Sequence, residues 1–497
     1  MVDWIQQSST ERLLITLLAA YFVYSIIQAL YNIAFHPLAT FPGPRLRAAF
    51  YFPNAYEVLT GEVPASWHGL HEQYGEVVRI NPNTLSYINP DAWRDIYGHG
   101  NKMPLLKDLS FYHQDGVIGR PDIISANDAD HAKIRRPLNY AFSEQALRIQ
   151  EGIIYSYIRL MITKFHKHAV SKTPVDIMRW LNFATFDITG DLTFDESFGS
   201  LNNENFNVWT ATLFKMVRAA SALRILREYP IVGVPAMALL RFVPALIKAR
   251  HAHVCFTREK VERRLKSETG RKDFLSYVLQ NDDGTRVTVD DIERTCSTLI
   301  VAGSETSATL LSGAIYYLLK NPQWMIKLRE EIDTAFQTDD QISFAAVSQL
   351  SILNAIINET FRMYPPVPTS LPRIVPPEGA IVCNNPLPPG TQLGIAQYAM
   401  YRSSTHFKNA DTFAPERFLG AEVYANDKRE VINPFSVGPR NCIGQSLAWA
   451  EIRTILVRLV WHFDMQLEDE SVEWEKQKVF ILWQKAPLMV KSVARTH

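Results

Sequence analysis

Residues 435–444 (FSVGPRNCIG) hold one cysteine in a turn-forming frame, directly before a helical pattern. A cysteine at a helix N-terminus faces backbone N–H groups and the positive end of the helix dipole, which favour its thiolate. Gly438 would permit the positive φ of a sharp turn, Gly444 would let the helix approach a flat cofactor closely, and Arg440 could pair with a carboxylate. The Cys442 thiolate is therefore a candidate iron ligand.

The segment 302–307 (AGSETS) is the second candidate, inside a long apolar pattern that predicts a helix over 292–319. A glycine with neighbouring hydroxyls is locally unfavourable in mid-helix, so a compensating role is expected. The plain alternative is that Thr306 bonds back to a helix carbonyl and that Glu305 is solvated.

Glu359 and Arg362 form the third candidate, because a spacing of three places them on one helix face. Arg417 follows in the segment 415–418 (PERF), shortly before the cysteine loop. Taken alone, a surface ion pair here and a buried free thiol at Cys442 are the plain alternatives.

The spacing aromatic-x-x-Gly-x-Arg-x-Cys-x-Gly, which starts at Phe435, resembles the haem-binding loop of the cytochrome P-450 family. The resemblance implies a mainly α haem-thiolate fold with a minor β lobe, with haem b ligated by Cys442. It also implies a catalytic pair, Thr306 and Glu305, and a buried structural network of Glu359, Arg362 and Arg417. Finally, it implies haem contacts from Ala302 and Gly303, which would make room for dioxygen, and from Phe435, Gly438 and Gly444.

The haem propionates are expected to meet basic residues from three parts of the chain. Residues 130–136 (DHAKIRR) resemble the family's Trp-x-x-x-Arg helix, with His131 in the tryptophan position and Arg135 as the arginine. Arg373, after the Glu-x-x-Arg helix, and Arg440 supply two more cations. By family position, the segments 100–128, 231–243, 367–371 and 480–483 should line the substrate pocket.

The rest of the chain is expected to be one large domain behind a membrane anchor. Its 497 residues carry 51 basic and 51 acidic side chains, and this zero net charge gives no reason to expect a nucleic-acid partner. A charge-free stretch over 13–35 is long enough to span a bilayer, and prolines follow it. We expect a lumenal segment 1–12, an anchor 13–35, a proline-rich hinge 36–48 and a cytosolic monooxygenase domain 49–497 on the endoplasmic reticulum.

The hinge sequences FHPL and FPGP resemble fungal secondary-metabolism members of the family, similar to isotrichodermin and averantin hydroxylases. The resemblance implies an NADPH- and O2-dependent monooxygenase that oxidises an apolar terpenoid or polyketide intermediate. Electrons would come from NADPH–cytochrome P-450 reductase, with cytochrome b5 as an additional donor. Two alternatives stay open: a haem-thiolate isomerase or dehydratase without external reductant, and a non-catalytic, membrane-tethered haem carrier.

Overall fold

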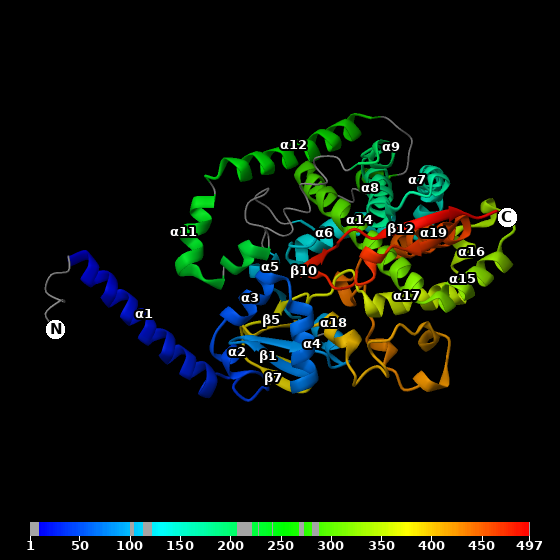
Figure 1. Cartoon of the computed structure of the whole chain (residues 1–497). Coiled ribbons are helices and arrows are strands. Elements are labelled where there is room, and N and C mark those ends of the chain that lie inside the picture. The colour runs from blue at the N-terminus through cyan, green and yellow to red at the C-terminus, as the bar shows by residue number, and fades with distance from the viewer. Residues whose placement is uncertain are drawn as a thin grey trace.

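Helix α14 (Val289–Lys320) runs through the helical body of the protein (Figure 1). The structure is a computed structural model that describes residues 9–99, 104–112, 122–205, 221–226, 228–240, 242–267, 273–280 and 288–496. Thr288 begins α14 with a capping box, in which its side chain and that of Asp291 each accept a backbone N–H. The helix continues unbroken through residues 302–307.

The helices that pack most extensively on α14 are α8 (Ile177–Phe194), α17 (Ser351–Met363) and α19 (Gln445–His462). Residues 180–194 of α8 are all buried, as expected for a helix that is surrounded by protein on every side. The segment that holds Cys442 leads straight into α19, so the packing of α19 on α14 brings the cysteine loop and the central helix into one site.

Further helices complete the body and connect it to the β lobe. They are α2 (Arg45–Ala49), α3 (Phe52–Thr60), α4 (Val63–Tyr74), α5 (Leu109–Tyr112), α6 (Asp128–Ala141), α7 (Glu144–Ser171), α9 (Ser200–Asn203), α11 (Pro230–Leu240), α12 (Pro244–Lys266), α13 (Phe274–Gln280), α15 (Pro322–Ala335), α16 (Phe344–Val347) and α18 (Gln397–Arg402). Short helical turns include η2 (Trp93–Tyr97), η4 (Pro415–Phe418) and η7 (Gly438–Arg440).

The β lobe is built on a five-stranded sheet in the order β1-β2-β8-β5-β3. These strands are β1 (Val77–Asn81), β2 (Thr84–Tyr87), β3 (Leu106–Lys107), β5 (Arg373–Ile374) and β8 (Gln392–Ile395). Only the β2–β8 pair is parallel. Smaller sheets join β4 (Val175–Asp176), β12 (Met489–Ala494) and β9 (Phe463–Leu467), then β10 (Lys478–Phe480) with β11 (Leu482–Gln484), and β6 (Ala380–Val382) with β7 (Asn385–Leu387). The predicted mainly α fold with a minor β lobe is therefore confirmed.

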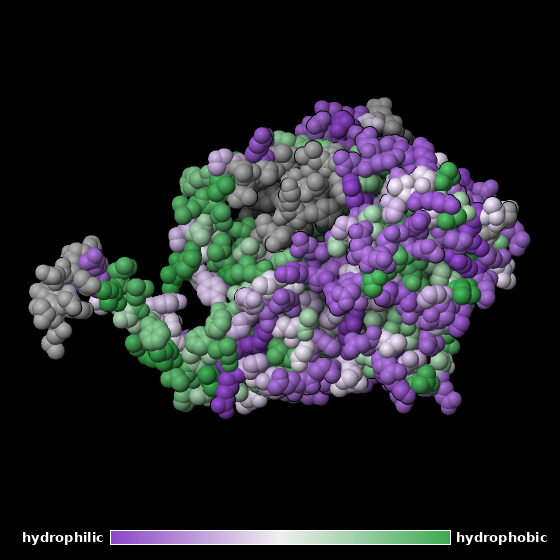
Figure 2. All heavy atoms as spheres, in the orientation of Figure 1, coloured by the Kyte–Doolittle hydropathy of each residue, from purple (hydrophilic) through white to green (hydrophobic). Residues whose placement is uncertain are grey.

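Helix α1 (Ser9–Ala34) projects from the body, and its surface is apolar over most of its length (Figures 1 and 2). Its segment Glu11–Ala34 is the described helix that is long and apolar enough to cross a membrane. Only its C-terminal end is docked: the Asn32 amide donates to the Ala49 carbonyl at 3.1 Å, and Arg79 donates to the Asn32 carbonyl at 2.9 Å. The predicted apolar span thus exists as one helix that is fixed to the body at one end.

Candidate active site

The cysteine loop is held in shape by its own backbone. The Cys442 N–H donates to the Phe435 carbonyl at 2.8 Å, which closes the loop ahead of α19. Gly438 has a φ of +79°, and a Cβ at this position would overlap the Tyr97 carbonyl oxygen. This position therefore requires glycine for both its backbone conformation and its space. A Cβ at Gly444 would come no closer than 3.8 Å to a described neighbour, so protein packing does not require this glycine.

The environment of Cys442 differs from the sequence-based expectation. Although part of the side chain is accessible, protein surrounds the thiol closely enough that burial raises its pKa. The Gly444 N–H and the Arg135 charge act in the opposite direction but do not outweigh burial. The helix N-terminus alone therefore does not produce a thiolate, and a metal cation at the sulfur would have to supply the missing stabilisation.

Arg135 and Arg440 tie helix α6 to the cysteine loop. Arg135 donates to the carbonyl and side-chain oxygens of Asn441, each at 2.6 Å, so it supports the loop that carries Cys442. Arg440 pairs with Asp128 at 2.6 Å and donates to the Ala126 carbonyl at 2.8 Å. The Nη1 atom of Arg440 is buried and has no hydrogen-bond partner among the described residues.

More cations gather beside Arg440 than the sequence predicted. Lys107 lies near Arg373 and Arg440, and burial followed by these two charges lowers its pKa to about 6, while Asp122 and Asp128 act in the opposite direction. Arg373 is buried, lies over the Tyr97 ring at 5.1 Å and donates to the Tyr112 hydroxyl at 3.3 Å. No described carboxylate forms an ion pair with Arg373.

His131 lies in the same group of charges and is uncharged at neutral pH. Burial lowers its pKa to about 4, with help from Arg440, Arg135 and Lys107. Its neutral imidazole can still donate a hydrogen bond to an anion. The structure thus brings His131, Arg135, Arg373 and Arg440 together in one cluster. Lys107 also belongs to this cluster, although no sequence motif indicated it.

This cluster provides a test of whether the residues fit the expected haem. Among the described residues, only Asp128 forms an ion pair with one of the three arginines, and Lys107 can take up a further proton when an anion binds. One buried guanidinium nitrogen lacks an acceptor. A dianionic group bound beside the Cys442 loop would supply both the negative charge and the acceptor. The site therefore fits a haem whose two propionates meet these cations.

Side chains of the 302–307 segment of α14 lie in different surroundings. Ala302 is exposed, and the Thr306 hydroxyl on the same helix face donates to its carbonyl at 2.6 Å. Gly303 lies where α14 approaches α8. A Cβ at Gly303 would lie 3.1 Å from Thr189 of α8, so this glycine allows the close approach of α8 and α14.

Glu305 is not solvated. It is buried, and its carboxylate pairs with the buried Lys485 ammonium at 2.7 Å. Lys485 also donates to the Thr309 hydroxyl at 2.9 Å. Burial raises the pKa of Glu305, and Lys485 opposes this rise. The second carboxylate oxygen has no hydrogen-bond partner among the described residues.

Glu359, Arg362 and Arg417 meet in a fully buried network. Arg362 binds Glu359 at 2.7 and 2.8 Å, and Arg417 binds the same carboxylate at 3.3 Å. Arg417 also pairs with Asp427, which the sequence did not indicate. Asp427 makes the network neutral, with two carboxylates for two guanidinium groups. The surface alternative for the Glu359–Arg362 pair is therefore wrong.

The four expected pocket segments have different positions. One cavity is lined by Thr369 and Ser370, by Phe480 and Ile481, and by Asp108 and Phe111. These come from three of the four segments, although residues 100–103 and 113–121 lie outside the described part. The fourth segment, 231–243, was expected to line the substrate pocket, but it lies elsewhere. Its large apolar side chains Ile231, Val232, Val234, Leu239 and Phe242 are exposed, and none of its described residues lines this cavity.

Comparison with known proteins agrees with this site. The cytochrome P450 family model matches residues 42–492, so the chain belongs to the cytochrome P450 family. It is 41% identical to the cytochrome P450 monooxygenase astA of Talaromyces wortmannii, over 97% of each chain. It is also 41% identical to the averantin hydroxylase of Aspergillus parasiticus, over 93% of each chain. The protein is accordingly a cytochrome P450 monooxygenase, an oxidoreductase of the type found in fungal secondary metabolism.

Proposed function

We propose that this protein is an NADPH- and O2-dependent haem-thiolate monooxygenase, with Cys442 as the axial ligand of haem b. The observation that supports this best is the surplus of cations beside the Cys442 loop, because it calls for a dianion there. Haem with a thiolate ligand supplies the oxidising chemistry, which inserts one oxygen atom into a C–H bond. Since a ligating cysteine is deprotonated, metal binding offsets the burial that keeps the free thiol protonated.

The protein's own residues would bind, orient and supply protons. Arg373, Arg440 and Lys107 would hold the propionates, while Arg135 keeps the cysteine loop in place. The Thr306 hydroxyl donates its proton to the Ala302 carbonyl, so it would have to turn away from this carbonyl before it could donate to a bound group. Glu305 is the proposed proton carrier behind it. Because the ion pair with Lys485 holds its carboxylate ionised, this pair must loosen and the carboxylate must take up a proton from solvent before it can pass one toward Thr306.

Partners and location are part of the same proposal. The chain would lie on the endoplasmic reticulum through a span at 13–35, with residues 1–12 in the lumen, a hinge at 36–48 and domain 49–497 in the cytosol. NADPH–cytochrome P-450 reductase, assisted by cytochrome b5, would deliver electrons there. The substrate would be an apolar terpenoid or polyketide intermediate, a class supported by the 41% identity to an averantin hydroxylase.

The first test is the absorption spectrum of the detergent-solubilised, reduced protein under carbon monoxide. A thiolate ligand shifts the Soret band far to the red of a histidine-ligated haem. We expect this shift in the wild type and in the control Cys383→Ala, and its loss in Cys442→Ala. A haem-free wild type, or an unchanged band in Cys442→Ala, would overturn the haem-thiolate assignment.

The second test separates the monooxygenase from its alternatives. With reductase and substrate, we expect NADPH consumption coupled to a product that carries one added oxygen atom. We expect Thr306→Ala to give less product per NADPH. Turnover without NADPH would instead identify an isomerase or dehydratase, and haem binding without any turnover would identify a carrier.

A further inference from the structure

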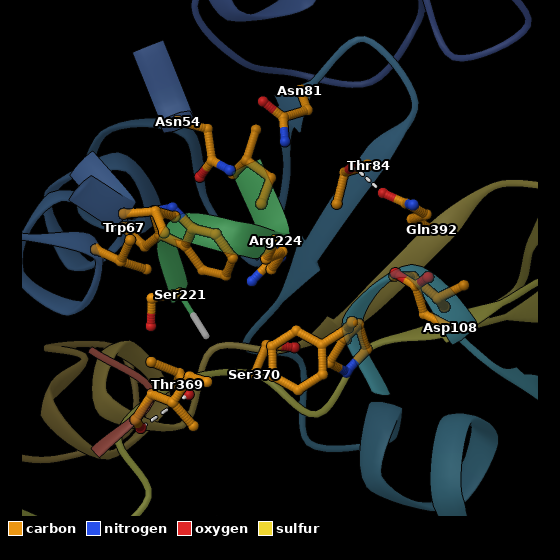
Figure 3. A pocket seen from close by; sticks show the side chains of 18 of the residues that line it. Asn54, Trp67, Asn81, Thr84, Asp108, Ser221, Arg224, Thr369, Ser370 and Gln392 are labelled. Carbon is orange, nitrogen blue, oxygen red and sulfur yellow. Dashed lines mark hydrogen bonds between the residues drawn. The ribbon is translucent and has the colours of Figure 1, made fainter. Parts of the chain in front are cut away.

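The cavity between the β lobe and the helical body contains buried polar atoms that have no partner. It is lined by α3, α4, β1, β2, β8 and the β10–β11 hairpin. Its cavity volume is about 50 Å³, within about 760 Å³ of empty space that includes open solvent at its mouth. Figure 3 shows its polar side chains, among them Asn54, Trp67 and Asn81. Their exposed fractions are 1%, 8% and 3%.

These three residues offer both kinds of hydrogen-bonding atom. The side-chain oxygens of Asn54 and Asn81 and the Trp67 Nε1 are buried without a partner among the described residues. The amide oxygens accept hydrogen bonds, whereas the indole N–H only donates. Buried polar atoms of this kind are costly unless a ligand or water satisfies them.

The other lining residues restrict the ligand further. Val58, Val63, Leu85, Leu393 and Val479 provide apolar walls. The described lining has one cation, Arg224, and one carboxylate, Asp108. Arg224 also lies 3.6 Å from Glu228, outside the lining, and over the Phe111 ring at 4.8 Å. The cavity therefore has no surplus cation among its described residues that would favour a carboxylate ligand.

We propose that this cavity binds a neutral lipophilic alcohol or phenol through Asn54, Trp67 and Asn81. A hydroxyl donates to an amide oxygen and accepts from the indole N–H, whereas an ether or ketone oxygen only accepts. Thr369, Ser370, Phe480 and Ile481 belong both to this cavity and to the expected substrate pocket. Resting on the proposed function, the site would make the substrate an already hydroxylated molecule, so an earlier hydroxyl-forming reaction must supply it.

The experiment compares 2-naphthol with 2-methoxynaphthalene by equilibrium dialysis against the full-length, detergent-solubilised holoprotein. The two probes share one ring system, but only 2-naphthol donates a hydrogen bond. We expect 2-naphthol to bind the wild type about three- to tenfold more tightly, which is the ratio that one net hydrogen bond supplies. Asn54→Leu and Asn81→Leu should reduce this preference, whereas Trp67→Phe should weaken both probes.

Thr84→Val is the matched control, because the Thr84 hydroxyl lines the cavity but already bonds Gln392 at 3.0 Å. It should keep the preference for 2-naphthol. Equal binding of the two probes to the wild type would overturn the proposal, as would asparagine variants that affect both probes alike. The carbon monoxide spectrum of each variant reports folding and haem ligation separately, so the alcohol site and the haem-thiolate function can fail independently.

Discussion

The buried ion pair between Lys485 and Glu305 favours the ionised carboxylate. A double-mutant cycle can measure the energy of this interaction. Lys485→Met leaves the buried Glu305 carboxylate without its cation, which should lower the free energy of unfolding by roughly 3–5 kcal/mol. Glu305→Gln together with Lys485→Met should cost clearly less than the two single changes summed. Urea unfolding followed by circular dichroism measures each variant. Additive single changes would show that the two groups do not interact.

Glu451 on α19 is a buried acid that should make stability depend on pH. Burial raises its pKa from 4.5 to about 8, although the Ser307 hydroxyl donates to it at 3.2 Å. The folded state therefore holds a proton that the unfolded state releases above about pH 4.5. Consequently, the free energy of unfolding should fall as the pH rises from about 4.5 to about 8.

Glu451→Gln should remove this fall and make the protein more stable than the wild type at pH 8, by a few kcal/mol. Urea unfolding at a series of pH values measures the difference between the two proteins. The exposed Glu470→Gln is the control and should follow the wild type. Parallel pH profiles for the wild type and Glu451→Gln would show that the carboxylate is already ionised in the folded state.

Individual site residues could be predicted from the sequence where they belong to a motif with fixed spacing. They could not be predicted where only the fold brings them together. Cys442 and the Glu359–Arg362 pair have fixed spacing, so the sequence indicated them. Lys107 and Lys485 have no such spacing. The arginines beside Lys107 and the carboxylate that pairs with Lys485 each lie more than a hundred residues away in the chain. An isolated lysine in a sequence carries no sign that it will be buried beside a charge.

Among the secondary-structure elements, the buried network joins helix α17 to the η4 turn. Arg417→Met should leave the carboxylates of Glu359 and Asp427 short of a cation, at a cost of roughly 3–5 kcal/mol and with lower haem occupancy. Asp427→Asn should cost less, about 1–3 kcal/mol, because Arg417 keeps its bond to Glu359. Thermal unfolding and the haem-to-protein absorbance ratio measure both effects.

Arg94→Met is the control for this network, because Arg94 pairs with Asp91 and Asp95 on the surface with 68% of its side chain exposed. Its loss should change the free energy of unfolding far less than Arg417→Met does, because exposed ion pairs contribute little to stability. If Arg417→Met were equally mild, the network would not hold α17 and η4 together.

The spacing of apolar residues predicted where helices form better than it predicted what their apolar side chains contact. The apolar pattern over 292–319, which predicted a helix, lies within α14. Segment 231–243 was expected inside the pocket, but its apolar side chains face outward. An apolar run has the same composition whether it meets a substrate, protein or lipid, so its direction comes only from the fold.

Across the entire chain, exposed apolar surface is concentrated on α1 and α11 (Figure 2). The exposed part of α1 ends where Asn32 and Ala29 are buried against the body. A truncation before Gln28 therefore removes the projecting helix and keeps the docked end. This division allows membrane attachment to be separated from folding.

A chain that starts at Gln28 after an initiating methionine should fold, bind haem and give the same carbon monoxide spectrum as the full chain. It should lose most of its association with phosphatidylcholine vesicles in a flotation assay, because the apolar segment that can span the bilayer is gone. The full-length variant Ile231→Ser with Leu239→Ser is the control, and it should still float with the vesicles. If the truncated chain floats like the full chain, while the same truncation with both serines does not, the exposed side chains of α11 hold the membrane without α1.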